Sequence, residues 1–268
     1  MALEIHFDIF TYGKRLPDEV PIFDVVTPGW TEEEVRALAR DFGIDGKPEP
    51  RGHRFVVGGG AAGTLEVFIA SHSLRWSRPA ARSAEDLTPF TLSDPETICV
   101  ADKFLNDHQV WARNAAHVHH TPVGVFAARV ERGAPPPAMH ICVSKQVNYT
   151  LSAEHEAMEY RVGGPGSKMQ VTVGADGEVQ EVYRFSRKLA FREFKPRKTI
   201  EKSIEKAIEQ FAAKGLAGVS ALFIDMEYHA EPPREMQALV APFYKATGTR
   251  HGLVGPETEF LARIPALG

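Results

Sequence analysis

Residues 160–185 read YRVGGPGSKMQVTVGADGEVQEVYRF, and this stretch decides which kind of sheet the chain can form. Its two runs of strand-forming residues, at 169–173 and 178–185, flank the dipeptide Asp176-Gly177. Asp-Gly between two such runs is typical of a tight hairpin turn. The sequence therefore predicts a pair of antiparallel strands that are adjacent in the chain.

The glycine-rich start of this stretch, GGPGSK at 163–168, raises the question of a phosphate-binding loop. Such a loop needs the spacing GxxxxGK[ST] between a strand and a helix, so that backbone amides and the helix N-terminus converge on the phosphate. The segment lacks this spacing and precedes a strand. Because Gly-Pro-Gly is strong turn chemistry, we interpret it as a structural turn.

Three helices are predicted outside this stretch. The segments TEEEVRALARDFG (31–43) and SDPETICVADKFLNDH (93–108) each begin with a capping box, in which Thr or Ser is followed three residues later by Glu. The segment TIEKSIEKAIEQFAAKG (199–215) has an apolar stripe of helical period and ends at glycine. The repeated Glu and Lys of this third helix indicate a solvated face.

Strand candidates outnumber these helices, and single helices separate runs of strands. This order predicts an α+β fold, because a doubly wound parallel sheet needs a helix between nearly all strands. A unit of strand, helix and hairpin strands occurs before residue 90 and recurs in larger form after it. We therefore expect two related units, 1–90 and 91–268, each with an antiparallel sheet packed against a single helix. The strand candidates beyond the hairpin are 19–26, 54–70, 73–77, 123–131, 139–150, 219–230, 236–248 and 258–267.

The composition narrows the class of partner. The 268 residues are 43% hydrophobic and carry a formal net charge of -4, without the excess of cations that duplex nucleic acid requires. The sequence has no cationic start before an apolar run, and no stretch near the ~20 apolar residues of a membrane span. We expect a cytoplasmic protein that binds neither nucleic acid nor a membrane. The oligomeric state is left open.

Four segments carry a resemblance to a known family: LPDEVPIFDVVTPGWTEEEVRALARDFGIDGKPE, DPETICVADKFLND, VGGPGSKMQVTVGADGEVQEVYRFSRKL, and MQALVAPFYKATG followed by FLARIPAL. They resemble segments of the secreted PepSY-like and YycI-like two-unit proteins of Gram-positive bacteria. The resemblance implies a helix packed on an antiparallel sheet in each half, and a binding, inhibitory or regulatory module without catalytic residues to carry over. A cytoplasmic version of this scaffold is suited to hold a peptide, as in the peptide-binding proteins of crocagin-type ribosomal-peptide maturation.

The segment RFSRKLAFREFKPRK (184–198) interleaves cations with phenylalanines. One interpretation is an amphipathic strand whose aromatic side chains face the core. The other is a strip that binds an acidic peptide by salt bridges and strand addition. The acidic overall charge favours an acidic peptide over single-stranded nucleic acid. We predict Arg184, Arg187, Lys188, Phe191 and Arg192 as peptide-binding residues.

The histidines at 117–120, HVHH, support an alternative function. In an extended segment His117 and His119 share one face, and His140 is the natural third ligand for one metal ion. The alternative hypothesis is an enzyme that modifies a bound peptide with a divalent metal such as iron or zinc, through these residues and His120. The leading hypothesis needs no cofactor, and no catalytic residue is predicted.

The segment LSAEHEAMEY (151–160) superficially resembles the HExxH motif of zinc proteases. It contains one histidine and no second one at the required helical spacing, so the protease interpretation fails. We expect its glutamates to form a solvated face.

Overall fold

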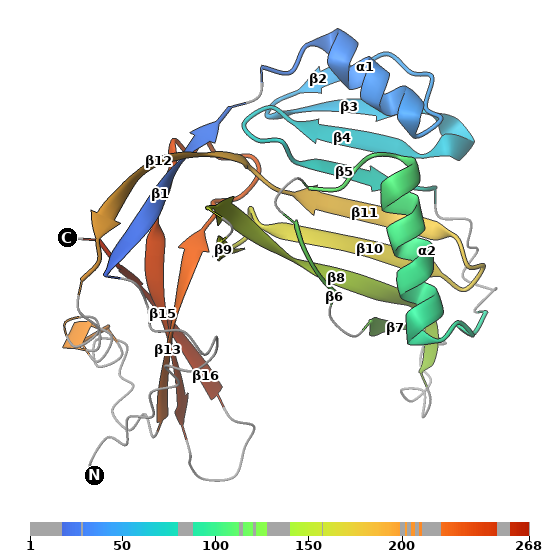
Figure 1. The fold of residues 1–268 in the computed structure, drawn as a ribbon. Helices are drawn as coiled ribbons and strands as arrows, with labels where there is room; N and C mark the ends of the chain where they lie inside the picture. Colours follow the sequence, from blue (N-terminus) through green and yellow to red (C-terminus); the bar gives the residue numbers. More distant parts are fainter. Residues whose placement is uncertain are drawn as a thin grey trace.

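The computed structural model has mixed α+β architecture dominated by antiparallel sheet, as the sequence predicts (Figure 1). Among its described residues no helix is long and apolar enough to cross a membrane. The described residues are 18–27, 29–79, 88–112, 115–119, 122–127, 140–156, 158–198, 202, 205–206, 209–210, 221–250 and 258–267.

The strands form a larger and a smaller sheet. The smaller sheet has the order β12 (Lys188–Pro196), β1 (Glu19–Val26) and β14 (Leu239–Val240). The larger sheet has the order β16-β15-β13-β9-β8-β10-β11-β5-β4-β3-β2, with β6 and β7 also paired to β8. Its strands are β2 (Glu49–Arg51), β3 (Arg54–Gly58), β4 (Thr64–Phe68), β5 (Leu74–Ser77), β6 (Ala115–His119), β7 (Val123–Ala127), β8 (Ile141–His155), β9 (Met158–Gly163), β10 (Lys168–Gly174), β11 (Val179–Phe185), β13 (Ala221–His229), β15 (Pro242–Arg250) and β16 (Thr258–Pro265).

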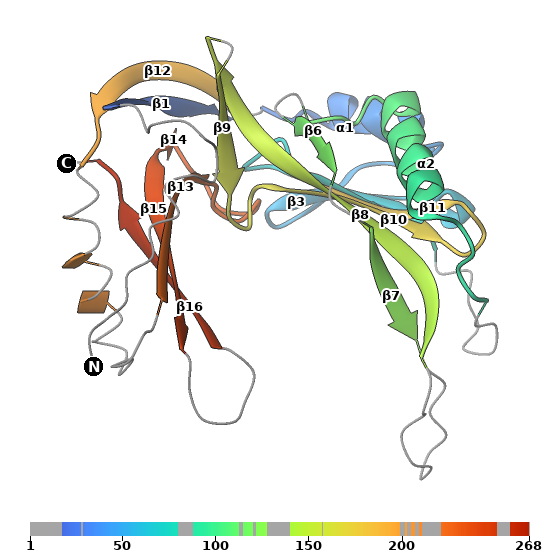
Figure 2. The same ribbon diagram turned by 60° about the horizontal axis from the view of Figure 1, so that its bottom comes forward.

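The strand β8 connects the two parts of the larger sheet (Figure 2). Strand β10 pairs with its first part, Ser144–Tyr149, and β9 pairs with its last part, Leu151–His155. Because β6 and β7 occupy the other side of β8, β9 and β10 lie one after the other along the same side. The predicted hairpin follows as β10 and β11.

The GGPGSK segment is the break between β9 and β10, and it is a structural turn. The end of β13 enters this break: Ala230 N donates to Gly163 O at 2.9 Å, and Gly166 N donates to Ala230 O at 3.0 Å. A side chain at Gly166 has no room, since a Cβ there would lie 1.8 Å from Glu231 O. Gly164 has a φ of +94°, which glycine adopts at little cost.

Helices α1 (Glu32–Asp41) and α2 (Asp94–Asp107) lie on one face of the larger sheet (Figure 1). Both predicted capping boxes are present. The apolar stripes of the two helices pack against β3, β4, β5, β8, β10 and β11 to form the main core. Of the predicted third helix, Lys202, Glu205, Lys206, Glu209 and Gln210 are helical, and its other positions lie outside the described residues.

A second core joins the smaller sheet to β8, β9 and β13. Phe23, Tyr160 and Tyr228 form a triangle of edge-to-face and tilted rings with centroids 5.5 to 6.2 Å apart. Tyr228 also donates its hydroxyl to Pro21 O at 2.8 Å. The predicted units, 1–90 and 91–268, share both sheets, because β5 pairs with β11 and β1 pairs with β12.

We predict that Gly166→Ala lowers the free energy of unfolding by about 1–3 kcal/mol, because the new methyl group must displace the backbone at Glu231. The matched control is Gly58→Ala, where no atom lies within 4 Å of the added Cβ. Urea denaturation of both variants measures the difference. Equal stability of the two variants would contradict the close packing of β13 against the break.

Candidate functional site

The strand β12 lies at the end of its sheet. It pairs with β1 over its whole length, and no described strand occupies its other side. A bulge opposite Ile22 and Phe23 places Arg192 outside the regular register. An edge strand presents backbone groups that another strand can bind.

Hydrogen bonds around β1 show which backbone groups of β12 point outward. Val25 N donates to Ala238 O, so the backbone N–H and C=O groups of the odd-numbered residues of β1 point towards β14. On the other side Arg197 N donates to Asp18 O, so the backbone groups of the even-numbered residues of β1 point towards β12. Hydrogen-bonded and non-bonded pairs alternate in antiparallel sheets. The β12 residues opposite the odd-numbered positions of β1 therefore direct their backbone N–H and C=O groups away from β1. These residues are Leu189, Phe191, Phe194 and Pro196.

The exposed backbone ends just beyond β12. Lys198 N donates to Ala266 O at 2.7 Å, and Arg197 forms a bridge with Leu267, so the C-terminal segment occupies the edge there. We call the backbone of residues 189–196 the open edge. At ~3.3 Å per residue it is about 25 Å long, enough for an extended peptide of seven or eight residues.

A cluster of rings lies at the open edge. His155, the last residue of β8, stacks on Phe191 with centroids 3.8 Å apart and planes 9° apart. Phe194 meets the same imidazole edge-on at 5.3 Å and lies 5.2 Å from the Phe191 ring. Phe191 and Phe194 remain 41% exposed, and Met158 in the adjoining β9 is 43% exposed. We call His155, Met158, Phe191 and Phe194 the ring platform.

Two of the predicted peptide-binding cations point into the protein. Arg184 is partly buried and donates from Nη2 to His72 O at 2.8 Å, and burial lowers the pKa of its guanidinium to about 10. Arg187 is 3% exposed. Neither guanidinium is available to a peptide at the surface.

Arg187 connects its own strand to two other segments of the chain. Its Nη1 donates to Ala70 O at 3.3 Å, and its Nη2 lies 2.9 to 3.0 Å from the carbonyl oxygens of Glu231, Pro232 and Glu235. Burial lowers the pKa of this guanidinium, although the nearby Glu231 and Glu235 carboxylates act in the opposite direction.

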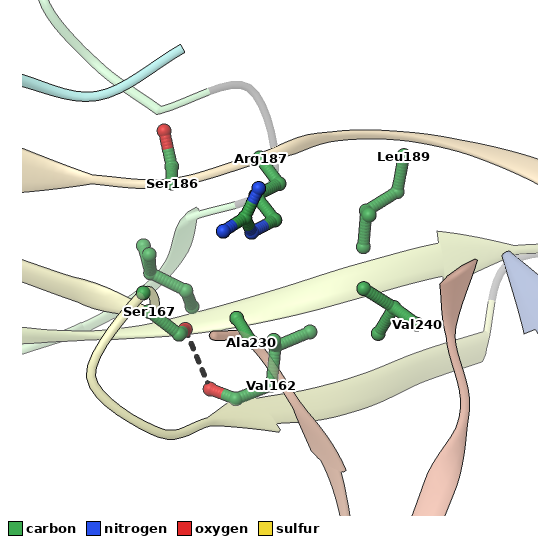
Figure 3. A pocket seen from close by; sticks show the side chains of 9 residues that line it. Val162, Ser167, Ser186, Arg187, Leu189, Ala230 and Val240 are labelled. Atoms are coloured by element: carbon green, nitrogen blue, oxygen red, sulfur yellow. Dashed lines mark hydrogen bonds between the residues drawn. The ribbon is translucent and has the colours of Figure 1, made fainter. Parts of the chain in front are cut away.

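A small pocket beside Arg187 is lined mainly by apolar side chains from several strands, among them Val162, Leu189 and Val240 (Figure 3). The Ser167 hydroxyl at its rim donates to Val162 O at 2.7 Å. We therefore assign the pocket to the packing around Arg187, and not to a ligand.

The remaining predicted residues, Lys188, Phe191 and Arg192, are exposed on β12. Arg192 Nη1 lies 3.2 Å from Asp24 Oδ1, and its Nε lies 3.6 Å from Glu193 Oε1. Lys195, which the sequence analysis did not select, is also exposed and lies 3.3 Å from the same Glu193 oxygen. Exposed pairs of this kind contribute little to stability, so their cations can exchange partners.

The aromatic side chains of the strip divide between core and surface. Phe185 is partly buried and packs edge-on against Phe68 at 5.5 Å, as an amphipathic strand predicts. Phe191 and Phe194 lie on the core-facing side of β12, since Phe191 is opposite Phe23, but they extend past the rim of the second core and remain exposed. The sequence analysis also missed His155, since only the fold brings β8 against β12.

Two histidines of the alternative hypothesis can be placed relative to β8. His119 in β6 pairs with Tyr149, whereas His140 is exposed and directly precedes β8. His140 and Tyr149, the partner of His119, are nine residues apart along the extended chain, which corresponds to ~30 Å. The register therefore does not bring His140 to His119. His120 and the side chains of His117 and His119 lie outside the described residues. No group of three potential metal ligands occurs among the side chains that the structure describes.

No family model matches the chain, and no curated protein does. Its fold is similar to the crystal structure of an uncharacterized protein from Eubacterium rectale ATCC 33656, with a TM-score of 0.52 and 9% sequence identity. The match covers 93% of this chain and 84% of that one. At this identity the similarity shows the fold alone.

We predict that Arg187→Met lowers the free energy of unfolding by about 2–4 kcal/mol, because it leaves several carbonyl groups without their donor in a buried site. Lys188→Met removes the neighbouring, exposed cation and is the control, which should change stability little. Chemical denaturation followed by tryptophan fluorescence compares them. An Arg187→Met variant with an unchanged free energy of unfolding would show that the guanidinium does not hold the three segments together.

Proposed function

We propose that the protein binds an extended peptide, which adds as a strand to the open edge of β12. The observation that carries this proposal is the row of outward-facing backbone groups at Leu189, Phe191 and Phe194. Strand addition uses such groups for affinity and uses side-chain contacts on alternate positions for specificity. The binding site is therefore the edge strand and not a cavity.

An acidic peptide suits the cations beside this edge. Lys188, Arg192 and Lys195 are exposed along β12, and among the described residues only Asp24 and Glu193 form ion pairs with them. A carboxylate on the peptide would replace these weak surface pairs. Arg184 and Arg187, which the sequence placed in the site, would instead support it from within by fixing the segments on which β12 begins.

The scaffold resemblance is compatible with this function. We propose that the chain is a cytoplasmic relative of the PepSY-like and YycI-like two-unit proteins, in which residues 1–90 and 91–268 are related units that each contribute a capped helix and antiparallel strands. Within that scaffold the open edge would hold a precursor peptide during ribosomal-peptide maturation. The protein then needs no catalytic group of its own.

The test uses a fluorescein-labelled nonapeptide of alternating Glu and Tyr and measures its affinity by fluorescence anisotropy. We predict that Lys188→Glu combined with Lys195→Glu weakens binding about 5- to 10-fold at low salt, because two attractive charges become repulsive. The matched control is Lys103→Glu on α2, which reverses an exposed charge far from β12. It should leave the affinity unchanged.

A backbone control tests the binding mode separately. A peptide that carries N-methyl groups at every second residue cannot donate to the edge in one register, so it should bind at least tenfold more weakly than its unmethylated form. If neither the charge reversal nor N-methylation changes the affinity, the peptide binds elsewhere and the proposal is wrong.

A further inference from the structure

We infer that the peptide alternates aromatic and acidic residues, with its aromatic side chains on the ring platform and its carboxylates on the opposite face, towards Lys188, Arg192 and Lys195. This inference rests on the proposed function and specifies the class of peptide that the open edge selects. It follows from the two unlike faces of β12.

The inner face of β12 is apolar. Leu189 packs against the second core, and Phe191 and Phe194 contact His155 of β8. These three residues also have the outward-facing backbone groups. A strand paired to them would extend the inner face of the smaller sheet next to the platform.

The platform exposes ring surface that the described part of the chain does not cover. Phe191 and Phe194 are each 41% exposed although they belong to a stacked cluster. Met158 adds a polarizable thioether, whose sulfur lies 3.7 Å from the Tyr160 hydroxyl. Aromatic side chains gain most from such a surface, by edge-to-face or offset stacking on the rings and by contact with sulfur.

The opposite, outer face of β12 carries the cations Lys188, Arg192 and Lys195, which outnumber the carboxylates of Glu193 and Asp24 on the same face. Asp24 is directly opposite Ala190, so both side chains lie on this face, and the ion pair between Arg192 and Asp24 places the guanidinium there as well. Lys188 is two residues before Ala190 and shares its face. The side chain of Phe194 lies on the inner face, so the side chain of the next residue, Lys195, lies on the outer face.

Side chains of an added strand alternate between these faces. Every second residue of the peptide would meet the ring platform, and the residues between them would meet the cations. The open edge is long enough for three or four residues of each kind.

A second copy of the chain fits this edge less well than such a peptide. If two β12 strands pair antiparallel with Leu189 of one copy opposite Phe194 of the other, Lys188 of one copy lies near Lys195 of the other. Like charges at such positions destabilise a sheet pair. The cationic face therefore favours an acidic strand as the occupant.

The experiment compares two labelled nonapeptides with the same composition of Tyr, Glu and Thr. In one peptide Tyr and Glu alternate, and in the other they form separate blocks. We expect the alternating peptide to bind at least tenfold more tightly in fluorescence anisotropy. We also expect Phe191→Ala and Phe194→Ala each to weaken its binding about 3- to 10-fold, while the weaker binding of the block peptide stays unchanged.

Phe126→Ala is the matched control, because Phe126 is a 62% exposed phenylalanine on β7, on the far side of the molecule from β12. It should not change the affinity for either peptide. Thermal melting of all variants establishes that they are folded. Phe191→Leu and Met158→Ala provide two further platform variants if an alanine variant melts early, and each should weaken binding of the alternating peptide in the same way.

The outcomes separate this inference from the function on which it rests. Equal affinity for both peptides, unaffected by the platform variants, would overturn the alternating pattern while leaving peptide binding in place. Failure of both peptides to bind would overturn the proposed function as well. A stable dimer in sedimentation, dissociated by Phe191→Ala, would assign the platform to a second copy and overturn the inference.

Discussion

The backbone pairing at the break between β9 and β10 is the constraint on which the rest of the structure depends. Both strands follow one side of β8, and the chain leaves that line only at the GGPGSK segment. The end of β13 occupies the gap through the hydrogen bonds between Gly163, Gly166 and Ala230. Residues without side chains are needed there because the β13 backbone passes within contact distance. The turn thereby divides one long sheet into two differently directed parts.

This division creates the candidate site. The smaller sheet packs across the second part of β8 and β9, so the end of β8 arrives beneath β12 and places His155 against Phe191. Arg187 holds the start of β12 by hydrogen bonds to the 231–235 segment and to Ala70. A cation that looked like a ligand-binding residue is thus part of the support, while its neighbour Lys188 reaches the surface.

Features that depend on neighbouring residues were predictable from the sequence. The capping boxes at Thr31 and Ser93 and the hairpin at Asp176-Gly177 all occur in the structure. The division of the basic strip into buried and exposed cations was not predictable, because it depends on contacts with distant segments: Arg187 is buried by its bonds to Ala70 and to residues 231–235, whereas Lys188, Arg192 and Lys195 lie on the exposed edge strand. The ion pair between Arg192 and Asp24, for example, joins residues 168 positions apart. No local pattern records which face of such a strand meets a core and which residues extend past its rim.

The most direct test of the central claim is amide hydrogen exchange of β12, measured by NMR with and without the alternating Glu/Tyr nonapeptide. Without peptide, the amides of Leu189, Phe191 and Phe194 should exchange quickly, and those of Ala190, Glu193 and Lys195 slowly, because only the latter face β1. With peptide, the fast group should become protected. Slow exchange of all six amides without peptide, or no added protection with bound peptide, would contradict an open edge that accepts a strand.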